Sequence, residues 1–117
     1  MRVRSLAVLS VLALVLAGAG SADARSVAAR ATTVDVTAKD FSFTLSKKTV
    51  PHGRVTFVIK NSGHTGHDFA IAGARSKTIN PGATTTLVVT LKPGRYPYRC
   101  TVDSHAKLGM KGVLHVT

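Results

Sequence analysis

The sequence predicts a single all-β domain, an antiparallel sandwich or closed barrel of seven or eight strands. Between residues 33 and 117, apolar and polar residues alternate with a period of two, which is typical of half-buried strands. Short clusters rich in Gly, Pro and Asn separate these runs and predict tight turns. The same region contains no long run with the apolar period of an amphipathic helix.

The expected strands are identified by apolar residues at alternate positions. In chain order these are Val34 and Val36; Phe41, Phe43 and Leu45; Val55, Phe57 and Ile59; Leu87, Val89 and Leu91; Tyr96, Tyr98 and Cys100; and Leu114 and Val116. The expected turns lie at 51–53, 61–63, 80–82 and 92–94, where Gly occurs together with Pro or Asn. The strands are therefore expected to bury one apolar face each in a shared core.

Residues 1–24 have the features of a secretory signal peptide. Arg2 and Arg4 precede an apolar run at 6–17, and a small-residue cleavage pattern ends at Ala24. The apolar run is shorter than the about 20 residues that a membrane-spanning helix needs. We therefore expect export to the periplasm, the cell envelope or the extracellular space, with a flexible leader at 25–32 and the domain at 33–117.

The chain is strongly basic, with 16 Lys and Arg against 5 Asp and Glu and a net charge of +11. Such a charge favours acidic partners or an anionic membrane or cell-envelope surface. The basic residues are scattered, with only Lys47 and Lys48 adjacent, and export also argues against nucleic acid, so we expect no nucleic-acid partner. A purely solubilising role for the charge stays open.

The single cysteine, Cys100, allows no internal disulfide. In an exported protein a lone cysteine indicates intermolecular pairing, a reactive thiol or a metal bond. Here Cys100, His105 and Met110 occur as Cys-x4-His-x4-Met in what is expected to be one loop between two strands. Copper prefers such soft sulfur and imidazole ligands, and two His, one Cys and a weak axial Met form the blue-copper set.

The second histidine of that set is expected upstream, at His67. The alternate residues that follow it, Phe69 and Ile71, are apolar, so its ring is expected on the core side of a strand. His64 is the alternative, but it lies in a Gly-rich turn. The two other histidines of the domain are expected to be ordinary surface residues, namely His52 and His115.

These two segments resemble those of a known family. Residues 96–116 resemble the copper loop of the cupredoxins, the family of plastocyanin and azurin. Residues 61–71 resemble that family's Asn-x-Gly…His-[Asn/Asp]-Phe segment. The resemblance implies a Greek-key β-sandwich that binds one copper ion, cycling between Cu(I) and Cu(II), with the ligands His67, Cys100, His105 and Met110.

The resemblance also implies roles for the neighbours of the ligands. The backbone N–H of Asp68 is expected to donate to the Cys100 sulfur, and the Asp68 carboxylate to bind Thr101 and steady the loop. The edge of His105 is the expected electron port. A small apolar docking patch ringed by positive charge is expected around this edge, formed by Ala106, Leu108 and Gly109 with Lys107 and Lys111.

The expected function is one-electron transport by a monomer, with an acidic redox protein as partner and no enzymatic activity. An envelope copper carrier with the same ligands is the main alternative. A copper oxidase or nitrite reductase needs a second copper site, for which the sequence offers no further histidine set. A zinc site built from the same residues would be colourless and redox-inactive.

Overall fold

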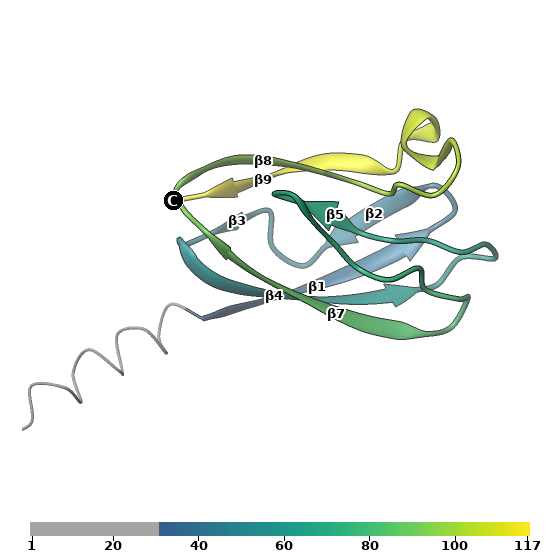
Figure 1. Cartoon of the computed structure of the whole chain (residues 1–117), viewed down its shortest axis with the longest axis horizontal. Helices are drawn as coiled ribbons and strands as arrows, with labels where there is room; N and C mark the ends of the chain where they lie inside the picture. The colour runs from purple at the N-terminus through teal and green to yellow at the C-terminus, as the bar shows by residue number, and fades with distance from the viewer. Residues whose placement is uncertain (1–30) are drawn as a thin grey trace, which may run out of the picture.

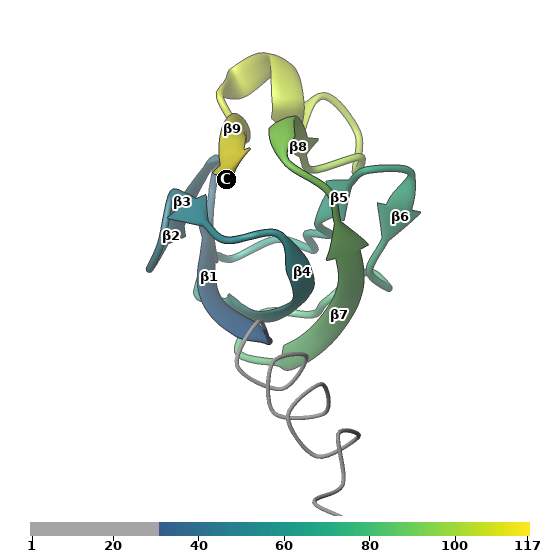
Figure 2. The same cartoon turned by 90° about the vertical axis from the view of Figure 1, so that its left-hand side faces the viewer.

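A computed structural model describes residues 31–117, which form two β-sheets packed face to face (Figures 1 and 2). The predicted signal peptide, 1–24, and the predicted leader up to residue 30 lie outside the described residues. The first sheet has the order β2-β1-β4-β7, with strands β1 (Thr32–Lys39), β2 (Ser42–Leu45), β4 (Gly53–Asn61) and β7 (Thr84–Leu91). The second has the order β3-β9-β8-β5-β6, with strands β3 (Thr49–Val50), β5 (Ala70–Ile71), β6 (Ala74–Arg75), β8 (Gly94–Arg99) and β9 (Lys111–Val116).

The predicted sandwich is confirmed, with two differences in detail. The described residues form nine strands, whereas seven or eight were expected. Strands β3, β5 and β6 have only two residues each and are too short to show alternation in sequence. The pairing is also not wholly antiparallel, since β1 is parallel to β4 and β3 is parallel to β9. The chain leaves the first sheet after β2, crosses to β3, and returns in β4 beside β1. Side-chain alternation is the same in both directions, so the sequence carries no signal for this crossover.

The core consists of the alternating apolar residues that the sequence predicts. Phe69 lies at its centre, with its ring 5.0 Å from the Phe57 ring and 5.4 Å from those of Phe43 and Tyr98. The inward-facing residues of β1, β4 and β9 are almost completely buried, including Val34, Val36, Val55, Phe57, Ile59, Leu114 and Val116. A core closed in this way provides a rigid base for the loops at its ends.

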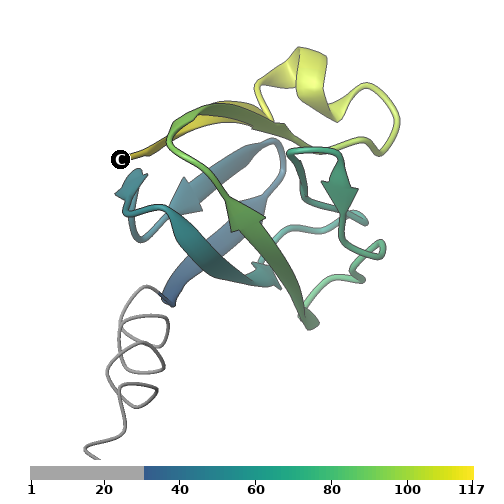
Figure 3. The same cartoon turned by 60° about the vertical axis from the view of Figure 1, so that its left-hand side comes forward.

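Four connections meet at one end of the sandwich. They are the β1–β2 turn, the segment from β4 to β5, the segment from β6 to β7, and the loop from β8 to β9 (Figure 1). The last of these contains the short 3-10 helix η1 (His105–Leu108), which stands beyond the ends of β8 and β9 (Figure 3). Within residues 31–117, no helix has the length and hydropathy needed to cross a membrane.

Candidate metal centre

His67 lies in an extended segment just before β5, and hydrogen bonds fix its backbone. Ile79 N donates to His67 O at 2.7 Å, and His67 N donates to Ile79 O at 3.2 Å. Buried Asn61, the last residue of β4, shapes the turn that leads to His67. Its Nδ2 donates to the carbonyls of Thr65 and Ile79, both at 2.8 Å, and its Oδ1 accepts from Gly63 N at 2.9 Å. The asparagine thereby ties the His67 segment to the first sheet.

The other predicted ligands lie in the β8–β9 loop, which backbone hydrogen bonds close on itself. Cys100 directly follows β8, and its N–H donates to Met110 O at 3.0 Å. Met110 N donates to His105 O at 3.1 Å. Gly109 ends η1 with φ at 118°, a backbone conformation that favours glycine. These bonds bring the first residue of the loop, the start of η1 and the residue before β9 together.

The two segments bring three ligand atoms together inside the protein. The Nδ1 atoms of His67 and His105 are 3.2 Å apart, and the Cys100 Sγ lies 3.9 Å from the first and 3.7 Å from the second. All three side chains are buried, with exposed fractions of 0%, 7% and 1% for His67, His105 and Cys100. In residues 31–117, this is the one group of three or more His, Cys, Asp or Glu residues that can hold a metal ion.

The cluster fits one copper ion. Ligand atoms about 2.0–2.3 Å from a common centre in a trigonal arrangement lie about 3.5–3.8 Å apart, close to the separations found here. Two imidazoles and one thiolate are the strong ligands of a blue-copper site. Met110, the predicted axial ligand, is completely buried and hydrogen-bonded to Cys100 through the backbone. Its bond to the metal stays a prediction.

The protein environment of Cys100 opposes a free thiolate and favours a metal-bound one. Burial raises the pKa of the thiol, while the backbone N–H groups of Asp68 and Val102 act in the opposite direction. The resemblance to the cupredoxins implies a hydrogen bond from Asp68 N–H to the sulfur, which stays a prediction. A bound cation removes the desolvation penalty of the anion and deprotonates a coordinating thiol.

The Asp68 carboxylate holds the start of the copper loop, as predicted. Its Oδ1 accepts from Thr101 N at 2.6 Å, and its Oδ2 accepts a short hydrogen bond from Thr101 Oγ1. Asp68 is nearly inaccessible to solvent, so water cannot easily replace these bonds. The residue after His67 is thereby joined to the residue after Cys100.

The remaining histidines of the described domain lie outside the cluster. The His64 side chain is 97% exposed, three residues from His67 but on the outer side of the turn. His52 is exposed and its Nδ1 lies 3.0 Å from Thr117 O, and His115 is exposed on β9. The structure therefore places His67, and not His64, beside Cys100 and His105.

Two residues of the site were not expected from the sequence, Asp40 and Phe41 in the β1–β2 turn. The Phe41 ring packs against the rings of His105 and His67, at centroid distances of 4.8 and 6.3 Å. Asp40 Oδ1 lies 2.7 Å from His67 Nε2. The hydrogen bond from His64 N–H is the main cause that holds the pKa of the Asp40 carboxyl well below its usual range, so this group is ionised at neutral pH.

The residues that follow His105 have the exposure expected of a docking patch. Leu108 is 61% exposed, and Gly109 is exposed beside it. Both predicted lysines, Lys107 and Lys111, are also exposed. Exposed apolar and basic residues therefore follow the buried His105 closely in the chain.

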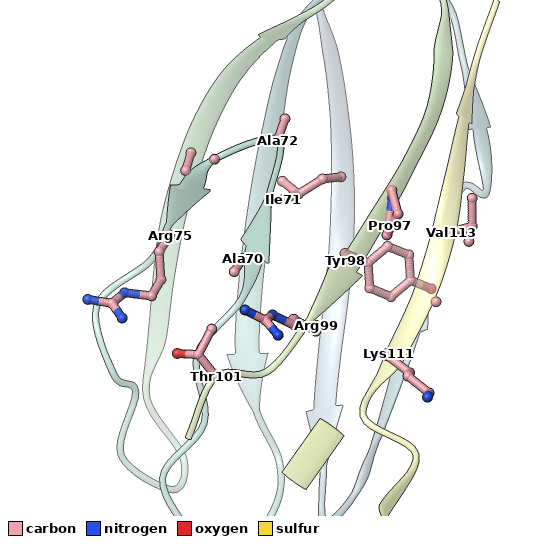
Figure 4. Close-up of a pocket in the computed structure, with 13 residues that line it drawn as sticks. Ala70, Ile71, Ala72, Arg75, Pro97, Tyr98, Arg99, Thr101, Lys111 and Val113 are labelled. Atoms are coloured by element: carbon pink, nitrogen blue, oxygen red, sulfur yellow. The ribbon is translucent and has the colours of Figure 1, made fainter. Parts of the chain in front are cut away.

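A separate cleft of about 1110 Å³ lies on the second sheet, between β5–β6 and β8–β9 (Figure 4). It is lined by apolar residues such as Ala70 and Pro97 and by the basic side chains of Arg75, Arg99 and Lys111. None of the predicted copper ligands lines it. The cleft is therefore a feature of the outer surface and not the metal centre.

Solved structures with a similar fold include two auracyanins. The Na-dithionite-reduced auracyanin of Roseiflexus castenholzii is 25% identical, with a TM-score of 0.62, over 75% of this chain and 97% of that one. Auracyanin A of Chloroflexus aurantiacus, described as a "blue" copper protein, is 22% identical, with a TM-score of 0.63, over 74% of this chain and 99% of that one. This chain therefore spans nearly the whole of both proteins.

A larger protein contains a domain of similar fold. The blue copper oxidase of Nitrosomonas europaea is 19% identical, with a TM-score of 0.60, over 74% of this chain but only 38% of the oxidase. No curated protein sequence matches the chain. The family pattern of the cupredoxin-like domain matches residues 6–116. This match covers almost the entire sequence, and the chain belongs to the cupredoxin-like family.

Proposed function

We propose that the chain is an exported mononuclear type 1 copper protein that carries one electron at a time. The observation that carries this proposal is the buried convergence of the His67, Cys100 and His105 ligand atoms. In this proposal Met110 is the weak axial ligand. Export rests on the signal-like sequence of residues 1–24.

The copper ion supplies a reversible one-electron couple, and the protein keeps the ligand geometry nearly unchanged during the transfer. The Asp68–Thr101 hydrogen bonds and the backbone bonds between Cys100, His105 and Met110 restrain the loop. Phe41 packs against the imidazole of His105 and reduces access of water. A site that moves little on a change of charge has a small reorganisation cost, which favours fast transfer.

The partner in this proposal is an acidic redox protein that docks over His105. Leu108 provides apolar contact, and Lys107 and Lys111 provide positive charge around it. Charge at the rim of an interface mainly raises the association rate, which suits a short-lived encounter. The chain acts as a monomer in this proposal.

The burial of the site favours electron transfer over copper delivery. A carrier that hands copper to another protein must expose ligands for exchange, whereas His67 and Met110 are completely buried and Cys100 is nearly so. Enzymatic activity is not part of the proposal.

The test is an optical spectrum of the copper-loaded, oxidised protein, followed by voltammetry. A copper bond to the Cys100 thiolate is expected to give an intense blue charge-transfer band and a reversible one-electron wave without loss of metal. Cys100→Ser is the matched control, and it should abolish the band and greatly weaken copper binding. A colourless Cu(II) protein, or a wave that decays as copper leaves, would contradict the proposal.

A further inference from the structure

We propose that Asp40 is a positioning residue of the copper centre. It binds His67 at Nε2, the ring nitrogen other than the one near Cys100 and His105, and it favours Cu(II) over Cu(I). This inference rests on the proposed copper site and extends it to a residue 27 positions away from the histidine. The contact is short and direct, with 2.7 Å between Asp40 Oδ1 and His67 Nε2.

The hydrogen bond fixes which nitrogen of His67 carries the proton. A carboxylate can only accept, so Nε2–H must be the donor in this contact. In a neutral imidazole the other nitrogen, Nδ1, then has a free lone pair. That nitrogen is the one that lies near Cys100 Sγ and His105 Nδ1. Asp40 therefore prepares His67 in the form that can bind a metal, as carboxylate–histidine pairs do in other metal sites.

The turn that carries His64 and Thr65 holds the Asp40 carboxylate in place. His64 N donates to Oδ2 at 2.8 Å, and Thr65 Oγ1 donates to Oδ1 at 2.9 Å. Asp40 is only about 20% exposed. Three donors on this turn, counting the weaker Thr65 N contact at 3.4 Å, thus aim the carboxylate at His67.

Gly63 leaves the space that this arrangement needs. A Cβ atom on Gly63 would overlap Asp40 Oδ1 and would come within 2.9 Å of His67 Nε2. A side chain at this position would therefore push the carboxylate and the imidazole apart. The glycine thus provides a second way to disturb the pair without removing the charge of Asp40.

The negative charge next to His67 makes the imidazole a better donor and stabilises the more highly charged metal ion. Removal of such a partner typically lowers metal affinity about 10–100-fold. The loss should be larger for Cu(II) than for Cu(I), because the attraction between charges grows with the charge of the ion. Each tenfold difference between the two losses corresponds to a rise of about 59 mV in the reduction potential.

The experiment compares the full chain with Asp40→Asn, Gly63→Ala and the control Asp35→Asn. Asp35 is an exposed aspartate of β1, the strand that leads to Asp40, so its substitution removes one negative charge without touching His67. Cu(II) and Cu(I) affinities are measured by competition with chelators, and the potential by voltammetry. Asp40→Asn should weaken Cu(II) binding about 10–100-fold and raise the potential. Gly63→Ala should act in the same direction, and Asp35→Asn should leave both values near those of the parent.

A metal-free readout keeps the test decisive if Asp40→Asn does not fold. Nitrogen-15 NMR of the metal-free parent should show the His67 proton on Nε2. A proton on Nδ1 in the parent, or equal potentials and affinities for Asp40→Asn and Asp35→Asn, would overturn the inference. Absence of a blue band in the parent would instead contradict the proposed copper function, whereas the NMR result would still test the Asp40–His67 pair.

Discussion

Replacement of Thr101 by Val should destabilise the domain through one hydrogen bond. Val has nearly the same shape as Thr, so it removes the Thr101 Oγ1 bond to Asp68 Oδ2 and retains the backbone bond to Oδ1. Asp68 is nearly inaccessible to water, so the lost partner is not replaced. A hydrogen bond to a charged group contributes about 1.5–3 kcal/mol. For a domain of this size, the corresponding decrease in Tm is about 6–24 °C.

The assay is thermal and chemical unfolding of the metal-free protein, with Thr86→Val as the matched control. Thr86 is exposed on β7, where the same substitution removes no buried partner. A double-mutant cycle with Asp68→Asn separates the pairwise energy from other effects of each change. A loss in the free energy of unfolding below about 0.5 kcal/mol, the usual range for a surface substitution, would refute the role assigned to this bond.

The remaining predictions concern the metal and its partner. His67→Ala should remove or shift the blue band, whereas His64→Ala should leave it nearly intact; the reverse result would assign the ligand to His64. Met110→Leu should retain copper and colour and raise the potential, which voltammetry measures; complete loss of copper would make Met110 a primary ligand. Lys107→Glu combined with Lys111→Glu should slow electron transfer with an acidic partner and leave the spectrum unchanged. The parent's rate should fall as salt rises, since the Debye length decreases from about 10 Å at 0.1 M to about 3 Å at 1 M, and a rate insensitive to both changes would place docking elsewhere.

The strands and the β8–β9 loop could be predicted because their signals are local. Val55, Phe57 and Ile59 alternate within one strand and are completely buried in the structure. Cys100 and His105 are close in sequence, and a loop between neighbouring strands brings their side chains together. His67 could be placed on the core side because the residues after it alternate in the same way.

The parallel strand pairs and the contact between Asp40 and His67 could not be predicted, for a common reason. Both depend on which distant segments become neighbours, and residue patterns within one segment do not contain that information. Asp40 is a single aspartate between two predicted strands, a common place for a turn residue. Its contact with His67 arises only because the β1–β2 turn and the β4–β5 segment meet at the same end of the sandwich.

The distribution of the proposed copper donors along the chain affects how metal and folding are coupled. Cys100, His105 and Met110 lie within eleven residues, so an unfolded chain keeps these three donors within reach of one ion. Only His67 must be recruited by folding. Metal stabilises a native state by the difference between its affinities for the folded and unfolded chains. Copper should therefore stabilise this fold by less than its total binding energy. The size of that stabilisation should depend largely on His67, the one donor that folding adds.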